Sequence, residues 1–330
     1  MKKMIIAAAV ASILAPATVL ADTTLYGALR MSAVSGDTQT SVAGSTASDF
    51  AGVVNNASRL GVKGSYGEEG GLTGFFHIQA EVTTDGQSTA AFDSRFAFAG
   101  VKGGFGKVVM GRLSSPYKMA GLKVDPFYDT SAGPTNSGSN FGLSSLTNGF
   151  LNNVVGYISP KLGGSVTLNA VAVLDKDDAT GTNQLGSDVA SNFYNVGATY
   201  SQNGLSASVQ YITEIEATRI TAGYKTGAFG VGFSYEDVSG ANTAATDDHT
   251  QTYLSGTYKV APKTTLAASY GTVSDNGSGV RNSAGDGYTL GVFHKVAPKT
   301  TVSALYSNVD YDLTTNADRN VFAIGLVQKF

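Results

Sequence analysis

The chain contains no cysteine, no tryptophan and only 7 prolines among its 330 residues. Without cysteine it has no disulfide framework, no thiolate chemistry and no cysteine-ligated metal site. After Leu20, no apolar run approaches the roughly 20 residues that a membrane-spanning helix needs. The formal net charge is −3, which argues against a nucleic-acid-binding protein, because such proteins carry a basic patch.

Sequence signatures of common catalytic sites are missing as well. The chain has 3 histidines, His77, His249 and His294, and they lie far apart. No GxSxG, HExxH or P-loop motif is present. His249 follows two aspartates, but a solvated loop explains that cluster more simply than a cation site. We therefore expect no catalysis, no cofactor and no metal site.

The first 21 residues have the pattern of a signal peptide. Two lysines precede an apolar, alanine-rich run from Met4 to Leu20 that contains Pro16. Small residues ending at Ala21 form a cleavage site, so we expect the mature chain to begin at Asp22. The alternative is a membrane-anchoring helix, which the short run, the proline and the cleavage site disfavour. The remaining 22–330 segment is expected to be one domain.

The composition of that segment favours β structure. The chain has 41 Gly, 16 Tyr and 16 Phe, and its mean hydropathy is +0.01. Glycine-rich and tyrosine-rich sequences without a long helical face are typical of strands and turns. Near-neutral hydropathy is also typical of a membrane barrel, in which one face of each strand meets lipid and the other meets water.

Many segments alternate strictly between apolar and polar residues. Leu60 and Val62 alternate with Arg59 and Lys63, and residues 194–200, 205–211 and 231–236 repeat the pattern. Period-two alternation predicts strands with two different faces. Both a β-sandwich and a spanning barrel produce it. Tyrosines tend to end the apolar faces, where an interfacial girdle would lie, although ordinary cross-strand packing is the alternative.

The connections between these segments can be counted. Seven are short and rich in Gly or Pro, and eight are mostly longer and more polar, so they would join 16 strands. The short turns are predicted at 67–71, 103–106, 159–164, 202–204, 226–230, 261–264 and 297–300, and the others near 35–55, 84–92, 114–151, 175–191, 214–218, 237–249, 273–285 and 310–318. Short turns on one side, longer loops on the other and an even strand number are features of outer-membrane barrels.

The last strand completes this pattern. Phe322, Ile324, Leu326 and Phe330 recur at period two at the end of the chain. An unpaired apolar edge would invite aggregation, so we expect the strand to pair on both sides. A closed antiparallel barrel provides both partners, with the last strand sealed against the segment from residue 25 to residue 33.

One connection, at about 114–151, is too long to be a simple turn. It carries Asp125 and Asp129, followed by a stretch rich in Gly, Ser and Asn. Folded inward, it would narrow an aqueous lumen and set an exclusion size. The alternative is a disordered external loop.

Charged residues on the polar faces of the strands are candidates for a pore lining. Arg59, Lys63 and Glu81 lie opposite apolar neighbours and are expected to face the lumen. Arg95 alternates with Phe96 and Phe98, so the same rule turns Arg95 inward and the two phenylalanines outward. A charge on the lipid face costs about 2–4 kcal/mol at the bilayer centre, which enforces the alternation.

Arg112 breaks that rule. It shares parity with Val108 and Met110, which would turn it toward lipid. Two explanations are open: Gly111 marks a bulge that resets the register, or Arg112 lies beyond the end of the strand. Basic wall residues facing acids on an inward loop would create a transverse field that discriminates ions by charge.

Several motifs along the whole mature chain resemble the general diffusion porins of Gram-negative bacteria, particularly those of betaproteobacteria. They are Thr24–Gly27, Ser58–Gly64, Arg95–Gly100, Gly103–Gly106 with Gly111 and Arg112, Asn153 with Tyr157 and Pro160, and the terminal Phe330. The resemblance implies a homotrimer of 16-stranded barrels in the outer membrane, with the third loop folded into each channel. It places Arg59, Arg95 and Arg112 near the constriction and makes Phe330 part of the signal that the outer-membrane assembly machinery reads. One expected arginine is replaced by Phe150.

The sequence thus predicts a transmembrane antiparallel barrel of 16 strands that passes small hydrophilic solutes and ions passively across the outer membrane. Its predicted constriction comprises Arg59, Lys63, Glu81, Arg95, Arg112, Asp125 and Asp129. A channel specific for an anion or a sugar is one alternative. A surface β-protein acting as an adhesin is another.

Overall fold

The computed structural model describes residues 20–40, 48–67, 70–86, 90–132, 142–143, 150–174, 192–239, 249–275, 284–312 and 317–330. The predicted signal peptide lies outside the described residues except for Leu20 and Ala21, and its cleavage stays a prediction. Among the described residues, no helix is long and apolar enough to span a membrane.

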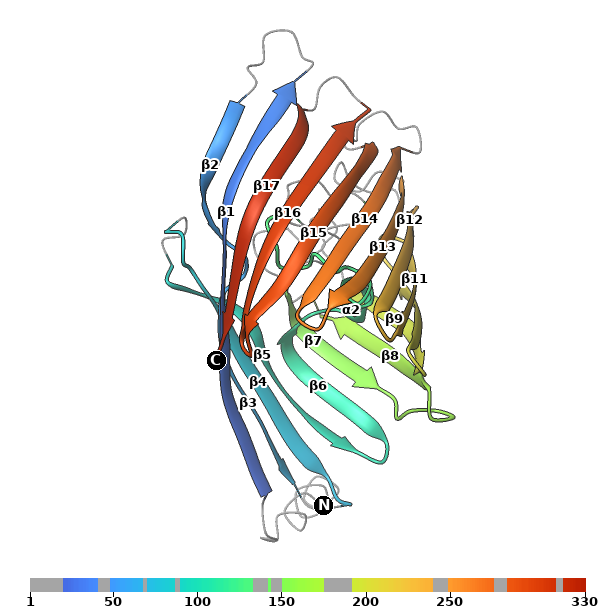
Figure 1. Ribbon diagram of the computed structural model, residues 1–330. Helices are drawn as coiled ribbons and strands as arrows, with labels where there is room; N and C mark the ends of the chain where they lie inside the picture. Colours follow the sequence, from blue (N-terminus) through green and yellow to red (C-terminus); the bar gives the residue numbers. More distant parts are fainter. Residues whose placement is uncertain are drawn as a thin grey trace, which may run out of the picture.

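Strands dominate the described part of the chain, with one short helix among them (Figure 1). The strands are β1 (Leu20–Thr40), β2 (Ser48–Asn55), β3 (Arg59–Gly67), β4 (Thr73–Val82), β5 (Phe92–Gly103), β6 (Gly106–Leu113), β7 (Leu151–Ile158), β8 (Val166–Val173), β9 (Phe193–Gln202), β10 (Leu205–Ile212), β11 (Ala217–Thr226), β12 (Phe229–Val238), β13 (His249–Ala261), β14 (Thr264–Asp275), β15 (Gly285–Ala297), β16 (Thr300–Tyr311) and β17 (Ala317–Lys329). The helix is α2 (Pro116–Leu122). Each of the seven predicted short turns joins two consecutive strands.

The strands form a closed antiparallel ring. Neighbours in sequence pair with each other, and β17 returns to pair with β1 from Ala28↔Lys329 to Thr40↔Ala317. Both β2 and β3 pair with β1, over successive halves of its length, so the 17 labelled segments occupy 16 strand positions. The predicted closed barrel of 16 strands is therefore confirmed.

Two details of the predicted strand boundaries are wrong. Leu25 and Tyr26 pair with β3 only, whereas β17 pairs with β1 from Ala28 to Thr40 and Phe330 bonds Gly27. The first predicted loop, near 35–55, is largely strand, because β1 continues to Thr40 and β2 begins at Ser48. Both differences reflect the length of β1, which spans Leu20–Thr40 and so extends beyond the predicted segment from residue 25 to residue 33.

The two faces of the wall differ as the alternation predicts. Outward positions carry exposed apolar side chains, including Leu25, Ile78, Met110, Leu254, Leu290 and Ile324. Inward positions carry small or polar ones, including Ser32, Gln79, Ser208, Thr221, Ser255 and Thr289. A bilayer solvates the first set and a water-filled lumen the second.

The register of β5 differs from simple alternation, because a bulge interrupts it at Arg95. Gln79 pairs with Phe96 whereas Ala80 pairs with Ser94, so Arg95 is the extra residue. A bulge re-aims the side chains that follow it. Phe96 and Phe98 pair with the inward Gln79 and His77, so the prediction that they face lipid is wrong, although Arg95 faces inward as expected.

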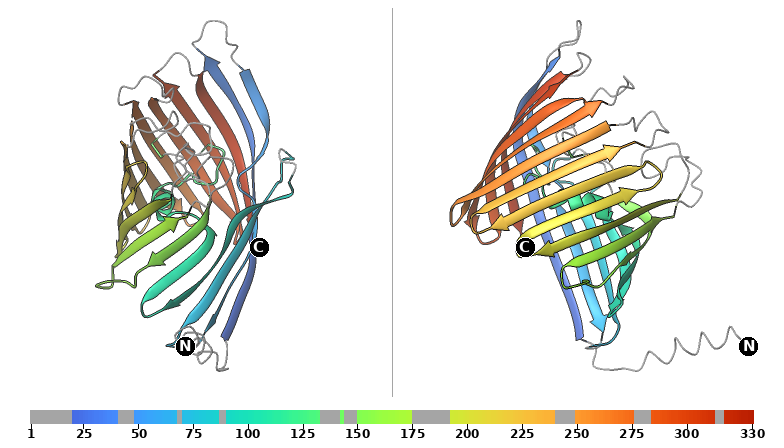
Figure 2. Two further views of the ribbon diagram at one scale, coloured as in Figure 1. Left: turned by 180° about the vertical axis from the view of Figure 1, so that it is seen from behind. Right: turned by 90° about the vertical axis from the view of Figure 1, so that its right-hand side faces the viewer.

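The third loop enters the barrel, as predicted. Figures 1 and 2 show α2 inside the ring of strands. Its apolar side packs with the inner wall in a cluster of Tyr117, Leu113, Leu151, Val154, Phe193 and Ile212, to which Phe75, Phe96 and Phe98 are partly buried neighbours. This cluster is the main core of the described structure.

Candidate functional site

The helix α2 begins with strong local signals. Ser115 is its N-cap: the Ser115 Oγ accepts a hydrogen bond from the Lys118 amide at 3.0 Å, and Pro116 occupies the first turn. An N-cap hydroxyl satisfies an amide that has no partner within the helix, and proline at the first position lacks that amide. The helix therefore starts where the chain leaves the end of β6 and turns into the lumen.

A buried polar cluster fastens α2 to the wall. The Tyr117 hydroxyl donates to Glu236 Oε2 at 2.7 Å, and Arg219 forms an ion pair with the same carboxylate. Arg219 Nη1 also donates to the Tyr117 carbonyl at 3.0 Å, and the Arg219 guanidinium lies 4.2 Å from the Tyr117 ring. Burial beside Glu236 raises the pKa of Tyr117 well above its usual value, so the tyrosine stays a donor.

A second set of contacts fastens the next part of the loop. Asp125 Oδ1 accepts from the Tyr253 hydroxyl and from the Phe127 amide, both at 2.8 Å. Ser255 donates to the Val124 carbonyl at 2.5 Å. Asp125 is buried, and burial raises the pKa of its carboxyl to about 6. The Asp125 side chain is turned into the wall on β13, so the structure does not bring it together with the other predicted constriction residues.

Asp129 points the opposite way, across the lumen. Its carboxylate forms an ion pair with Arg59, and Arg30 Nη1 lies 3.4 Å from the same oxygen. The break between β2 and β3 positions both arginines, because Ala57 has a φ of 59° and its carbonyl accepts from Arg59 Nε at 2.9 Å. At the same break, Ser58 Oγ accepts from the Arg30 amide at 2.8 Å.

A further ion pair lies beside this one on the wall. Arg95 Nη1 donates to Glu81 Oε2 at 2.6 Å, and Arg95 Nε donates to Gln79 Oε1 at 3.0 Å. Asn55 Nδ2 donates to the other Glu81 oxygen at 3.1 Å. Since the bulge places Arg95 next to Glu81, the carboxylate and the guanidinium are held in fixed positions at the lumen surface.

Three cations surround Phe150. Lys118 Nζ lies 4.5 Å from its ring centre, and the guanidinium carbons of Arg95 and Arg112 lie 4.7 and 5.7 Å away. Desolvation and the neighbouring Arg95 lower the pKa of Lys118 to about 8. Aromatic faces attract cations at this range, so Phe150 gathers positive charge at the position where an arginine was expected.

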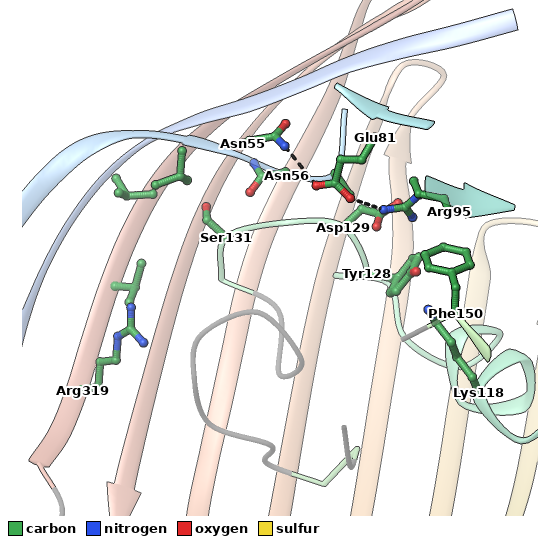
Figure 3. Close-up of a pocket in the computed structure, with 14 residues that line it drawn as sticks. Asn55, Asn56, Glu81, Arg95, Lys118, Tyr128, Asp129, Ser131, Phe150 and Arg319 are labelled. Atoms are coloured by element: carbon green, nitrogen blue, oxygen red, sulfur yellow. Dashed lines mark hydrogen bonds and ion pairs between the residues drawn. The ribbon is translucent and has the colours of Figure 1, made fainter. Parts of the chain in front are cut away.

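These groups meet in a cavity of about 470 Å³ between the loop and the wall (Figure 3). It is lined by Asn55, Glu81, Arg95, Lys118, Tyr128, Asp129, Ser131, Phe150 and Arg319, among others. Figure 3 shows Tyr128, Phe150 and Lys118 together on one side, with Arg319 on a strand of the other. We name this cavity the constriction, after the role that we propose for it below.

Charge in the constriction is unbalanced. Two carboxylates, Glu81 and Asp129, face the cations Arg95, Lys118 and Arg319 of the lining and the paired Arg30 and Arg59. The remainder of the loop, residues 133–149, contains no charged residue in the sequence. The five cations and two carboxylates named here therefore carry a net excess of three positive charges at neutral pH.

The structure brings some of the predicted site residues together and places others elsewhere. Arg59, Glu81, Arg95 and Asp129 lie together at the constriction, whereas Lys63 is exposed in a separate cavity with His77 and Lys107. Arg112 lies within β6, at a register shift between Gly111 and Leu113 where Gly111 has a φ of 128°. Its guanidinium donates to the Ser94 and Phe150 carbonyls at 3.1 and 2.9 Å, and to Asn152 at 2.5 Å.

Sequence reasoning missed three cations, Arg30, Lys118 and Arg319. Arg30 alternates with Leu25 and Leu29, so the same period-two rule would have turned it inward. Lys118 follows the Ser115–Pro116 helix start, but nothing in its spacing predicts which side of the loop it faces. Within the described ranges, no group of three or more His, Asp or Glu side chains could hold a metal ion.

Comparison with known protein families gives a match over nearly the whole chain. The sequence profile described as Gram-negative porin matches residues 7–326. A major outer membrane protein P.IB of Neisseria meningitidis is 34% identical over 126 residues, which span 37% of this chain and 36% of the relative. A P.IB protein of Neisseria gonorrhoeae is 31% identical over 133 residues, 38% of this chain and 36% of that one. The matched stretch thus spans about a third of these relatives.

Solved structures of similar fold cover nearly the whole chain. An anion-selective porin from Comamonas acidovorans superposes with a TM-score of 0.74 at 18% identity, over 94% of this chain and all of that one. OmpF of Salmonella typhi, in complex with daunomycin, gives a TM-score of 0.69 at 16% identity, over 93% and 97%. At these identities the likeness supports the fold alone.

Proposed function

Since this chain belongs to the Gram-negative porin family and therefore to the outer membrane, we propose that it forms a passive, water-filled channel for small hydrophilic solutes and ions. The observation that carries this proposal is the loop held across the lumen, with Asp129 facing Arg30 and Arg59. A fixed, charged narrowing of a wide barrel sets a size limit and a field without chemistry. Catalysis has no role in it.

The excess positive charge suggests a modest preference for anions. Charges that line a narrow aqueous gap between low-dielectric walls raise the local concentration of counterions. The Comamonas porin of similar fold is described as anion-selective, and a basic constriction would give this chain the same tendency. We expect the preference to be slight, because Glu81 and Asp129 offset part of the charge.

We further propose that the channel is a homotrimer exported by the 1–21 signal peptide and assembled through Phe330. Support for the trimer comes from structural neighbours, one of which is described as a trimer form of OmpT from Vibrio cholerae. A bilayer recording tests the channel and the trimer: the purified chain should give steps of conductance in groups of three. Folded protein that makes no pore and stays monomeric without detergent would instead support the adhesin reading, and saturation by one solute would support a specific channel.

Two loop aspartates allow a matched test of the constriction. Replacing Asp129 with asparagine should shift the reversal potential in a salt gradient toward anions, whereas Asp125→Asn should change it little, because Asp125 is turned into the wall. One charge at about 6 Å in water contributes roughly 0.7 kcal/mol, or about a threefold change in local ion concentration. Equal shifts in the two variants would contradict the assignment of Asp129 to the passage.

Selectivity should also depend on pH through Lys118. With a pKa of about 8, the lysine should go from about nine-tenths charged one unit below that pH to about one-tenth charged one unit above it. Anion preference should therefore fall as the pH rises through this range. In Lys118→Met the preference should already be low and should not change over the same interval. A wild-type reversal potential that stays constant from pH 7 to about pH 9 would show that Lys118 does not face the ion path.

A further inference from the structure

The lumen wall below the constriction carries a continuous row of rings, which we call the aromatic track: Phe150, Phe96, Phe98, His77 and Tyr26. The ring centres of Phe150 and Phe96 are 4.8 Å apart, and those of Phe96 and His77 are also 4.8 Å apart. His77 lies 5.4 Å from Phe98 and 5.8 Å from Tyr26. These separations are within the range of favourable aromatic pairs, so the five rings form one surface.

The track faces the lumen. His77 and Gln79 both contact the Tyr26 hydroxyl, on the side of β4 opposite the outward Ile78, which is 59% exposed. Phe96 and Phe98 pair with Gln79 and His77, on the inner side of the bulge at Arg95. All five rings are only partly buried. Part of their surface is therefore open to the water-filled passage.

This surface is confined to one side of the barrel. At several inward positions of β10 to β16 the side chains are polar, as at Gln210, Ser234, Gln251, Ser269 and Ser307. The inward apolar side chains of the same strands, Ile212, Val238, Tyr253 and Leu305, are fully buried. Apolar ring surface exposed to water is unfavourable, and the rings of the track differ from these buried side chains in being only partly covered. The track packs against the core under α2 at one edge, but that packing does not involve His77 or Tyr26.

Cations stand at both ends of the track. At the constriction, Arg95 and Lys118 lie 4.7 and 4.5 Å from the Phe150 ring. At the other end, Lys63 Nζ lies 5.5 Å from the Tyr26 ring, and Lys63, Lys102 and Lys107 line a cavity of about 400 Å³ with Phe75, His77 and Phe98. The three lysines are exposed, and Asp22 is the one acidic residue among the described residues of that cavity.

We propose that the aromatic track is a weak binding path for aromatic carboxylates of about the size of benzoate, a specificity that rests on the proposed channel function. A planar ring can stack on Phe96, Phe98 or His77 while its carboxylate meets Arg95 and Lys118 above or the lysines below. Cavities of a few hundred Å³ that combine apolar walls with a few charged groups are typical of small-molecule sites. Binding must be weak, because a channel has to release what it binds.

Two acids of equal charge and similar size separate ring stacking from simple burial. Purified full-length protein in a planar bilayer would be titrated with benzoate or cyclohexanecarboxylate, and the concentration that halves the potassium chloride current would be measured. Aromatic pairing should favour benzoate by about two- to tenfold. If burial of apolar surface alone mattered, the saturated acid would block equally well or better, and the proposal would be overturned. Neutral benzamide should block less than benzoate, and an equal effect would remove the role of the cations.

A double substitution locates the effect. In Phe96→Leu with Phe98→Leu, the preference for benzoate should disappear while the potassium chloride conductance stays near wild type, whereas Phe322→Leu on the outer wall should keep both. A retained preference would overturn the track as its source. If the double variant does not fold, the comparison of benzoate with cyclohexanecarboxylate on the wild-type protein still tests whether ring stacking contributes to binding. A chain that conducts no ions at all would count against the proposed channel, whereas a conducting chain that treats both acids alike would count only against the track.

Discussion

Replacing Glu236 with alanine should release α2 from the wall and make the channel wider and noisier. Glu236 is 1% exposed and accepts from Tyr117 while pairing with Arg219. Removing one member of a buried ion pair leaves the other charge uncompensated, which costs about 3–5 kcal/mol. We expect the loss to appear as higher single-channel conductance, permeation of larger sugars in liposome swelling, and a lower thermal stability of the folded barrel.

An apolar replacement of the whole cluster provides the matched control. Buried ion pairs can often be exchanged for hydrophobic residues of similar volume at little cost. The triple variant Arg219→Met, Glu236→Leu and Tyr117→Phe should therefore keep the loop in place and restore near-wild-type conductance. If Glu236→Ala leaves conductance and sugar permeation unchanged, the loop is held by its other contacts, and the polar cluster is not its main anchor.

Deleting Phe330 should sharply lower the yield of folded protein in the outer membrane. The Phe330 amide donates to the Gly27 carbonyl at 3.1 Å, and the Phe330 ring lies over Gly27, where a Cβ would collide with it. The residue thus completes the seam between β17 and β1, in addition to its proposed role as a signal for assembly. Channels that do form should keep the conductance and selectivity of the wild type, because the Phe330 ring lies over Gly27 on the outer face of the wall, whereas the constriction residues face the lumen.

A second phenylalanine of the same strand serves as the control. Phe322 is outward-facing and half exposed, as Phe330 is, so Phe322→Ala removes a similar apolar area while it leaves the backbone pairing of the seam intact. Its yield should stay close to wild type when measured by heat-modifiable migration on gels. Refolding into detergent without cellular machinery would then separate the two roles of Phe330. A normal yield in cells after the deletion would rule out both.

The strands could be predicted from the sequence because lipid and water impose opposite demands on alternate residues. That constraint predicted the strands and the inward direction of Arg59 and Glu81, and the strand number followed from counting the turns and loops between them. It applies equally to Arg30, which alternates with Leu25 and Leu29. Where one face of a strand meets lipid and the other meets water, the alternation of residues predicts which way each side chain points.

The rest depended on backbone irregularities and on contacts between distant residues. One extra residue at Arg95 turned Phe96 and Phe98 inward, and a bulge leaves little trace in a sequence of alternating residues. The directions of Asp125 and Asp129 were set by Tyr253 on one wall and Arg59 on the other. No local pattern distinguishes two aspartates four positions apart on a loop.

The way in which the loop is tied to both walls has a mechanical consequence. On one side it is bonded to Glu236, Tyr253 and Thr289, and on the other it is paired with Arg30 and Arg59. The loop therefore links two opposite walls of the barrel, as a brace does. Flattening the barrel along the direction that joins these walls would stretch or compress the contacts at both ends of the loop. The width of the passage is then fixed by the brace, and it should stay constant when the lateral pressure of the surrounding bilayer changes.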